Sequence, residues 1–357
     1  MSFDDVPKHP GELVLSNLKE YFRCADDGSV RDPEGHMWMM WNLVDFHRWW
    51  LAVETFSGVP LGRKLLNAAA DQEEYFLTST SILDVAWFRK KHRQNTALAN
   101  RWSLMGWGSF DLDTSFLTSN LMAPLCSGFA LAAKENISQS RYKIQWQQLS
   151  NNSIRLELKP MERRFSAAPA SPVLCWDSPS LPNISSFPFD LDLQTVSNGW
   201  THAGERSTML ANGIFARFFE TLTMQGIQLR PDWLECWKFP ESFDKRSQVP
   251  LVLCTLAVNQ LVSESEQPIY IQDVQSWNQL CDAYLVPFGL GKPLQINSLD
   301  EQGGVEFLLR PCSQWPLLVG YLFSFWQRGF GRKAKVEIQQ NDGSWSVKIS
   351  SLLSYVG

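Results

Sequence analysis

The apolar and polar positions follow the same order in each half of the chain. Stretches with apolar residues at helical spacing come first, and a Gly-x-Gly turn then leads into a short alternating run typical of a strand. A compact apolar segment follows, at residues 123–135 in one half and 315–327 in the other, and each half ends in two alternating runs joined by a turn. The pattern predicts two similar sets of elements: amphipathic helices, a strand pair, a short apolar helix and a hairpin.

Two stretches of sequence support an internal repeat. Residues 124–148 align with residues 316–340 without a gap, and the apolar positions coincide throughout although few residues are identical. An earlier aromatic segment, residues 46–50, compares with residues 215–219, and one Arg interrupts the aromatic face in each copy. Because several matches occur in the same order with similar spacing, we interpret the chain as an ancient tandem duplication.

The repeat predicts an α+β fold of two tandem pseudo-repeat domains, each with helices packed on a small antiparallel sheet. Residues 1–160 are expected to form the first domain with an N-terminal extension, and residues 200–357 the second. Residues 161–199 are rich in Pro and Ser, and proline at this density blocks both helix and central strand. Residues such as Trp176 make this segment too apolar for a free linker, so we expect an extended strap across the domain surfaces.

Composition adds a high aromatic content and a negative charge to this picture. Aromatic residues make up 13% of the chain, with 16 Trp, which indicates thick cores, an adhesive surface or a pocket for flat ligands. The net charge of −5 argues against a nucleic-acid partner, because non-specific binding of nucleic acid needs a basic surface. One basic cluster, residues 89–93, favours a solvated helix end; contact with phosphate or an anionic surface is the alternative.

The cysteines and the N-terminus indicate the compartment. The seven cysteines include no C-x-x-C pair, so neither a zinc finger nor a thioredoxin-type motif is indicated. The acidic start of the chain lacks a following apolar run, so no signal peptide is predicted. The longest apolar stretch, residues 315–326, is too short for a bilayer-spanning helix. We therefore expect a cytoplasmic protein in a reducing compartment, with no transmembrane segment.

The element order resembles that of the 4-vinyl-reductase domain superfamily. The motifs that carry the resemblance are residues 106–110 (Gly-Trp-Gly-Ser-Phe), the helix around residues 126–129 (Cys-Ser-Gly-Phe) and the hairpin from Tyr142 to Leu158. The superfamily includes ligand-sensing domains of aromatic-responsive activators, a protein of bacteriochlorophyll biosynthesis and the related TRAPP-type trafficking subunits. The resemblance implies a similar domain in each half and a hydrophobic or tetrapyrrole-like ligand.

Ligand-sensing members of the superfamily often hold zinc through cysteines on the apolar helix and in the final hairpin. Cys126 lies on the corresponding helix here, but residues 136–160 contain no cysteine. In the second copy Cys312 precedes the helix, and the hairpin again lacks cysteine. Because a tetrahedral zinc site needs about four soft ligands, no metal is predicted.

No pattern of residues predicts catalysis. His47 lies among aromatic residues and could contact a haem or another ligand, but a helix-surface histidine is the favoured interpretation, and the second copy has Ala216 at that place. Asp111 and Asp113 would share one strand face, which favours an exposed face over an acid–base pair. The sequence contains no G-x-S-x-G, phosphate-loop or dinucleotide motif. We therefore expect a protein that is not an enzyme.

The remaining candidates for function are aromatic residues that recur in both copies. An aromatic-lined cavity would suit a flat hydrophobic molecule, although core packing is the favoured interpretation of any single ring. The predicted ligand-binding residues are Phe46, Trp49, Trp50, Trp107, Cys126, Phe129, Phe215, Phe218, Phe219 and Tyr321. The leading hypothesis is a non-catalytic binding protein for a hydrophobic or tetrapyrrole-like small molecule. The alternative is an assembly or scaffold protein in which the two copies form an intramolecular pseudo-dimer that docks a protein partner.

Overall fold

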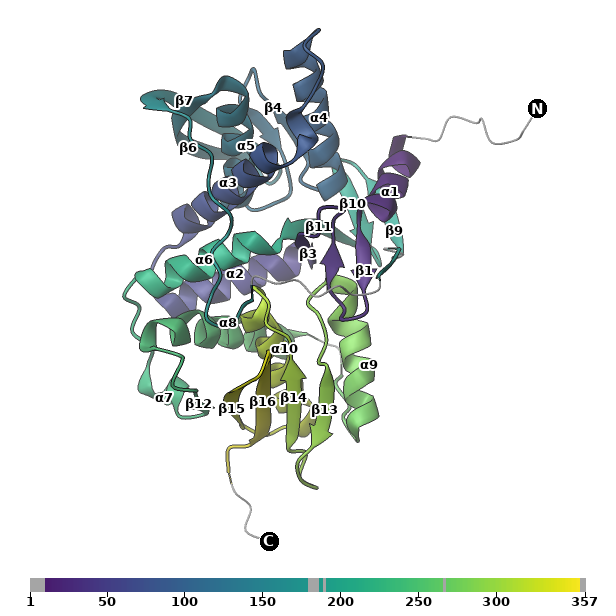
Figure 1. The fold of residues 1–357 in the computed structure, drawn as a ribbon, viewed down its shortest axis with the longest axis vertical. Helices are drawn as coiled ribbons and strands as arrows, with labels where there is room; N and C mark the ends of the chain where they lie inside the picture. Colours follow the sequence, from purple (N-terminus) through teal and green to yellow (C-terminus); the bar gives the residue numbers. More distant parts are fainter. Residues whose placement is uncertain (1–9, 179–185, 189–190, 266–267, 354–357) are drawn as a thin grey trace, which may run out of the picture.

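The computed structural model describes residues 10–178, 186–188, 191–265 and 268–353, and it has the α+β architecture that the sequence predicts (Figure 1). The elements of the first part of the chain are α1 (Pro10–Tyr21), β1 (Arg23–Ala25), β2 (Val30–Arg31), β3 (Met37–Asn42), α2 (Leu43–Ser57), α3 (Gly62–Ser79), the 3-10 helix η1 (Ser81–Leu83), α4 (Lys90–Met105), β4 (Ser109–Asp111), β5 (Phe116–Thr118), α5 (Ala123–Ser138), β6 (Ser140–Ser150) and β7 (Ser153–Arg164).

The second part of the chain supplies the remaining elements. They are β8 (Ser186–Pro188), β9 (Leu193–Val196), β10 (Gly199–His202), β11 (Glu205–Ala211), α6 (Asn212–Met224), α7 (Pro231–Leu234), β12 (Trp237–Lys238), α8 (Lys245–Glu264), α9 (Val274–Tyr284), the 3-10 helix η2 (Val286–Phe288), β13 (Gln295–Ser298), β14 (Val305–Leu309), α10 (Trp315–Phe330), β15 (Ala334–Asn341) and β16 (Ser344–Ser351). The short apolar helices and the two terminal hairpins that the sequence predicts are present as α5, α10, β6–β7 and β15–β16.

The strands form three sheets, and the largest joins the two parts of the chain. Its order is β8-β1-β2-β3-β11-β10-β9, so β3 of the first part pairs directly with β11 of the second. A four-stranded sheet, β4-β5-β7-β6, belongs to the first part, and a five-stranded sheet, β12-β15-β16-β14-β13, belongs to the second. Figure 1 shows these two smaller sheets at opposite ends of the molecule, with the joining sheet between them.

The elements occur in the same order on both sides of the joining sheet. The first part runs β3, α2, α3, α4, β4, β5, α5, β6 and β7, and the second runs β11, α6, α8, α9, β13, β14, α10, β15 and β16, with α7 and β12 inserted. The antiparallel register of β3 and β11 places Met40 opposite Met209. Each methionine lies the same number of residues before the aromatic segment of its own half, so the strand pair is centred on equivalent positions.

The helices that follow these two strands are exchanged between the parts. α2 packs on α8 of the second part, and α6 packs on α3 of the first part and also contacts α8. Asn42 begins α2, because its side-chain oxygen accepts hydrogen bonds from the main-chain N–H groups of Val44 (2.8 Å) and Asp45 (3.4 Å). The exchange means that neither part completes its core without a helix from the other.

The predicted linker, residues 161–199, is shorter at both ends in the structure. β7 extends to Arg164, and β9 begins at Leu193, where it precedes β10 and β11 as β1 and β2 precede β3. The N-terminal extension therefore reduces to the residues before β1. Within the linker, residues 165–178 are irregular and cross both parts of the molecule as a strap, and residues 186–188 form β8. Among the described residues, no helix combines the length and apolarity that crossing a bilayer requires.

Candidate functional site

Most of the predicted aromatic residues meet at the junction between the two parts of the chain. Phe215 of α6 lies 6.5 Å from Phe46 and 5.9 Å from Trp49 of α2, measured between ring centroids. Phe218 lies 5.2 Å from Trp50. The six junction rings, each at most 2% exposed, are Phe46, Trp49, Trp50, Phe215, Phe218 and Phe219. The structure brings these residues together as a shared core in which ring packs against ring.

The other predicted residues lie in three places. The rings of Trp107 and Phe129 stack with their centroids 3.8 Å apart, and the Trp107 indole donates a hydrogen bond to the Met209 carbonyl (2.9 Å). Cys126 is fully buried, and burial raises the pKa of its thiol to about 12, so the group is an inert part of the core. Tyr321 lies half-buried on α10. Neither of the two pockets described below includes any of the ten predicted residues in its lining.

An open groove with a volume of about 360 Å³ lies between α4 and β4 in the first part of the chain. Trp102 forms its floor, and Phe110 of β4 lies against Trp102 with ring centroids 5.6 Å apart and a tilt of 31°. Leu98, Ala99 and Leu112 complete the apolar lining. The first turns of α4 rise out of the molecule while its last turns are buried, so one face of the helix is left as a wall of the groove.

Two buried polar atoms of the groove residues have no hydrogen-bond partner. These atoms are the indole N–H of Trp102, a residue only 1% exposed, and the side-chain oxygen of Asn95. A buried donor or acceptor without a partner is unfavourable, but neither atom has surface open to the groove, so these two atoms do not define the ligand. Other buried indole N–H groups also lack partners, at Trp41, Trp49, Trp176 and Trp315, but those residues do not line the groove.

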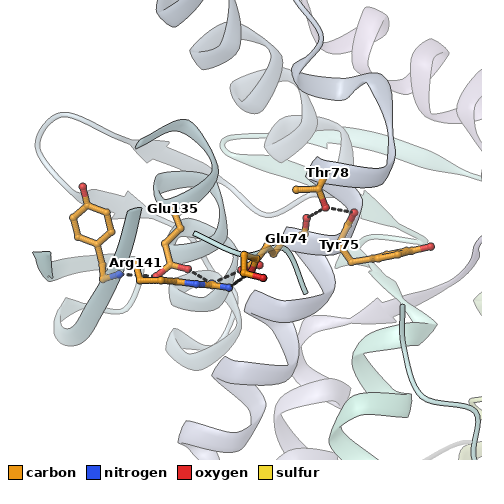
Figure 2. Close-up of polar contacts among 7 residues, drawn as sticks. Glu74, Tyr75, Thr78, Glu135 and Arg141 are labelled. Atoms are coloured by element: carbon orange, nitrogen blue, oxygen red, sulfur yellow. Dashed lines mark hydrogen bonds and ion pairs between the residues drawn. The ribbon is translucent and has the colours of Figure 1, made fainter. Parts of the chain in front are cut away.

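In the part of the chain that the structure describes, one arginine and two glutamates form a charged cluster that joins α3, α5 and β6 (Figure 2). Arg141 contacts the carboxylates of Glu74 and Glu135, each at 2.5 Å, and the second Glu135 oxygen accepts the main-chain N–H of Tyr142 (2.7 Å). Burial raises the pKa of Glu74, and the hydrogen bonds from Arg141 oppose that shift. Arg141 also donates to the carbonyl of Ser166, so the cluster anchors the strap to the first part.

A second ion pair lies on the next face of α3. Arg101 of α4 donates two hydrogen bonds to Glu73, at 2.7 and 2.8 Å, and both side chains are almost fully buried. The guanidinium also lies over the rings of Trp38, Phe76 and Trp107, at 5.3–5.6 Å from their centroids. In both clusters each carboxylate contacts a guanidinium, so the clusters join the elements that carry these residues.

A small pocket of about 40 Å³ lies between the β1–β2 hairpin, the strap and the second part. It contains Asp177, whose pKa burial raises to about 6, and Cys312, whose thiol pKa burial raises well above its usual value. A thiol that is held protonated is a poor nucleophile. The pocket has room for about three water molecules, which leaves no space for a substrate beside these groups.

Of the polar residues singled out in the sequence, His47 and Asp113 occupy ordinary surface positions, and Asp111 also lines the groove. His47 is exposed on α2. Asp111 accepts main-chain hydrogen bonds from Asp113 (2.9 Å) and Thr114 (3.1 Å), which hold the pKa of its carboxyl below the usual value. Asp113 pairs instead with Lys91 at 3.2 Å. Asp111 and Asp113 therefore close a strand turn and do not form an acid–base pair.

One group of carboxylate and imidazole side chains in the described part of the chain has the spacing of metal ligands: Asp32, Glu34 and His36. Asp32 already accepts hydrogen bonds from the main-chain N–H of His36 (2.8 Å) and the indole N–H of Trp38 (3.0 Å). These hydrogen bonds account for the position of the buried Asp32 carboxylate. The three residues therefore form a turn that orients the Trp38 side chain.

The basic cluster found in the sequence lies at the exposed start of α4, next to two exposed aromatic residues. Trp87 is 87% exposed and Phe88 is 57% exposed, and residues 89–93 are all exposed. The main-chain N–H of Lys90 donates to the carbonyl of Trp87 (3.2 Å), so a turn leads directly from the two rings into the helix. A solvated helix end, the favoured interpretation of the basic residues, does not account for the exposed rings.

Comparison of the chain with family models, with curated proteins and with solved structures finds no match. The function must therefore be argued from the geometry of the groove and of the exposed end of α4.

Sequence reasoning did not single out Asn95, Trp102, Trp87 or Phe88. A usable signal existed for the groove, because Asn95, Ala99 and Trp102 recur at helical spacing on one face of α4. Trp87 and Phe88 carried no such signal, since their exposure depends on where the start of α4 lies in the fold.

Proposed function

We propose that this chain is a non-catalytic binding protein that holds a small hydrophobic molecule in the groove between α4 and β4. The observation that carries the proposal is the composition of the groove, in which the rings of Trp102 and Phe110 lie beside the polar side chains of His92, Thr96 and Asp111. Binding sites for small molecules commonly combine an apolar lining with a few polar groups that fix orientation. The groove has this composition.

The lining defines the class of molecule. A flat, apolar body would lie against Trp102 and Phe110. Polar groups on the same ligand would form hydrogen bonds with the exposed lining side chains of His92, Thr96 and Asp111. The volume of about 360 Å³ is at the lower end of the range for small-molecule pockets, which favours a ligand of one or two rings over a complete tetrapyrrole.

The resemblance to 4-vinyl-reductase domains supports the same class of function. The β4 residue Phe110 belongs to the Gly-Trp-Gly-Ser-Phe motif that carries the resemblance, and that superfamily includes domains that sense aromatic ligands. Under the proposal the ligand lies beside this motif. The junction residues predicted from the sequence would then support the two halves without contacting the ligand.

The alternative, an assembly protein built as an intramolecular pseudo-dimer, also has support. The pairing of Met40 with Met209 and the exchange of α2 and α6 are the features that such a pseudo-dimer requires. We propose the pseudo-dimer as the frame of the molecule and the groove as its binding site.

The proposal is tested by binding of the neutral fluorescent probe N-phenyl-1-naphthylamine to the full chain. Ala99 lines the groove and is exposed, so Ala99→Trp fills the groove without disturbing the core. Asn100 is the next residue, is also exposed and does not line the groove, so Asn100→Trp is the matched control. We expect Ala99→Trp to weaken probe binding by about tenfold or more, which corresponds to about 1.4 kcal/mol, and Asn100→Trp to leave it unchanged.

Equal probe binding by both variants and the unaltered chain would refute the groove as the site. Native mass spectrometry of the protein purified from its own cells gives an independent test. A bound small molecule that is retained by Asn100→Trp and lost by Ala99→Trp would identify the ligand and its site together.

A further inference from the structure

We propose that the exposed start of α4 is a docking site for the anionic surface of a lipid membrane, distinct from the groove. This site, named the α4 tip, consists of Trp87, Phe88, Arg89, Lys90, Lys91 and Arg93. It combines exposed aromatic rings with a local excess of positive charge.

The aromatic pair is the first part of the argument. Trp87 has the largest exposed fraction, 87%, of the large apolar side chains in the described chain, and Phe88 lies beside it with the ring centroids 6.2 Å apart. Large rings are normally buried, because their transfer out of water is favourable. Tryptophan and phenylalanine that protrude together are typical of segments that insert into the boundary between lipid headgroups and acyl chains.

The charge around the rings is the second part. Arg89, Lys90, Lys91 and Arg93 are all exposed, and Asp84 is the one acidic residue between positions 84 and 93. The chain as a whole has a net charge of −5, so this positive charge is local and is opposed to the charge of the rest of the molecule. Lys91 contacts Asp113, but both side chains are about 70% exposed, and solvent screens the pair. Clustered basic residues beside apolar ones are attracted to anionic lipid headgroups.

The helix itself adds to this preference. The first turn of α4 contains no acidic residue, and no side chain caps its N-terminus. Because the N-terminal end of a helix carries a partial positive charge, basic residues there are repelled by it in the free protein. A negatively charged surface in front of the tip would relieve this repulsion and pair with the basic side chains at the same time.

The shape of the tip favours a membrane over an acidic protein. Figure 1 shows that α4 reaches the top end of the molecule, far from the five-stranded sheet. The last turns of α4 are anchored by the buried side chains of Trp102 and Met105, so the opposite end projects into solvent. A protein partner would need a pocket for both rings and a rim to exclude water, whereas a lipid interface deforms around protruding rings.

The test is cosedimentation of the full chain with vesicles of phosphatidylcholine, with and without about 30% phosphatidylserine. The two tip variants are Trp87→Ala/Phe88→Ala and Arg89→Gln/Lys90→Gln/Lys91→Gln. The matched aromatic control is Tyr270→Ala, which removes another ring that is 76% exposed. The charge control is Lys245→Gln/Arg246→Gln, which removes two exposed basic residues from the first turn of α8.

We expect the unaltered chain to bind vesicles only when phosphatidylserine is present, and less at high salt. Each tip variant should reduce the partition by about tenfold or more, the loss of two rings or of three charges, and both controls should bind as the unaltered chain does. Unchanged binding by the tip variants, or no binding by the unaltered chain, overturns the proposal. Binding to immobilised polyglutamate in place of vesicles, lost in the tip variants, overturns it in favour of an acidic protein.

Binding of N-phenyl-1-naphthylamine by the same samples separates this proposal from the proposed function. Tip variants that keep probe binding are folded and retain the groove, so their loss of vesicle binding is specific to the tip. An unaltered chain that binds vesicles but not the probe would refute the groove and leave the tip standing.

Discussion

The helices α4 and α9 hold the same place in the order of elements, but they differ in almost every respect that bears on function. The N-cap of α9 is Asp273, whose side chain accepts the main-chain N–H of Ser276 at 2.8 Å. The N-cap of α4 is Arg89, which makes no side-chain cap, and Lys90, Lys91 and Arg93 follow in the first turns. Trp277 of α9 packs closely on Phe307, with ring centroids 4.8 Å apart. Trp102 of α4 instead forms the floor of an open groove.

A second difference lies in the helices beneath them. α3 carries the buried charges Glu73 and Glu74 near its C-terminal end, while the buried residues near the same end of α8 are Leu261 and Val262. The second part therefore has an apolar, capped and closed arrangement, and the first part has a charged and open one. The shared frame therefore tolerates both arrangements, and the features suited to binding are concentrated in the first part.

The largest effect on stability should come from removing one buried charge from the first part. Arg101→Met leaves Glu73 buried without its partner, and we expect the free energy of unfolding to fall by about 3–5 kcal/mol. Urea denaturation followed by circular dichroism measures the change.

The double variant Glu73→Leu/Arg101→Met sharpens the comparison, because it gives α3 an apolar residue where α8 already has one. We expect it to recover most of the loss, since replacing both partners of a buried pair leaves no unpaired charge. A double variant as unstable as Arg101→Met would mean that the cost comes from lost packing of the Arg101 side chain on its aromatic neighbours.

A smaller effect on stability should distinguish two glycines, Gly128 and Gly320, at which an apolar helix crosses its neighbour. A Cβ added at Gly128 of α5 would lie 2.5 Å from the main-chain oxygen of Leu66, whereas one added at Gly320 of α10 would lie 3.1 Å from the Val258 side chain. We expect Gly128→Ala to destabilise by about 1–3 kcal/mol. Gly320→Ala should be close to neutral, because alanine's higher helix propensity offsets the contact. Equal melting temperatures for the two variants would contradict this difference.

Two carboxyl groups near the ends of the strap, Glu74 of α3 and Asp177 of the strap itself, lie in different surroundings, and pH should reveal the difference. Glu74 has Arg141 as a partner, but Asp177, at the other end of the strap, is half-buried and its pKa is raised to about 6. Because the folded state holds this proton more tightly than the unfolded state, stability falls as pH rises from about 4 to about 6 and then stays at the lower level. Asp177→Asn should therefore stabilise by about 2 kcal/mol near pH 7.5 and have little effect near pH 4.

Thermal melts of both proteins at the two pH values measure this effect. A variant that is equally stabilised at both pH values would assign the change to the amide's own contacts and not to the carboxyl proton.

The smallest effect on stability is expected at the α4 tip. Trp87→Ala should change the free energy of unfolding by less than about 0.5 kcal/mol, because the ring is 87% exposed. Trp277→Ala, at the corresponding end of the second part, should cost about 3–5 kcal/mol, because that ring is buried against Phe307. Chemical denaturation of the two variants compares them directly, and a large loss for Trp87→Ala would show that the tip packs on the molecule in solution.

The fold class, the apolar helices and the terminal hairpins could be predicted, because each follows from local spacing of apolar residues and from turn residues such as those at 341–344. The pairing of β3 with β11 could not, since register between distant strands depends on the whole core. The same reason explains the aromatic residues. Recurrence identified Phe46 and Phe215 as important, but their role in joining the halves arises only when α2 and α6 lie side by side.

The exchange of helices has a consequence for synthesis of the chain on the ribosome. The strand Met37–Asn42 and the helix after it are made early, but the strand that pairs with them ends at Ala211 and the helix on which α2 packs comes later still. At roughly 5–20 residues per second, this delay is about 8 to 30 seconds. Throughout that time a strand rich in Met and Trp has an unpaired edge, and aromatic side chains of α2 face water. The nascent chain therefore exposes apolar surface that can be buried only after the second part has been translated.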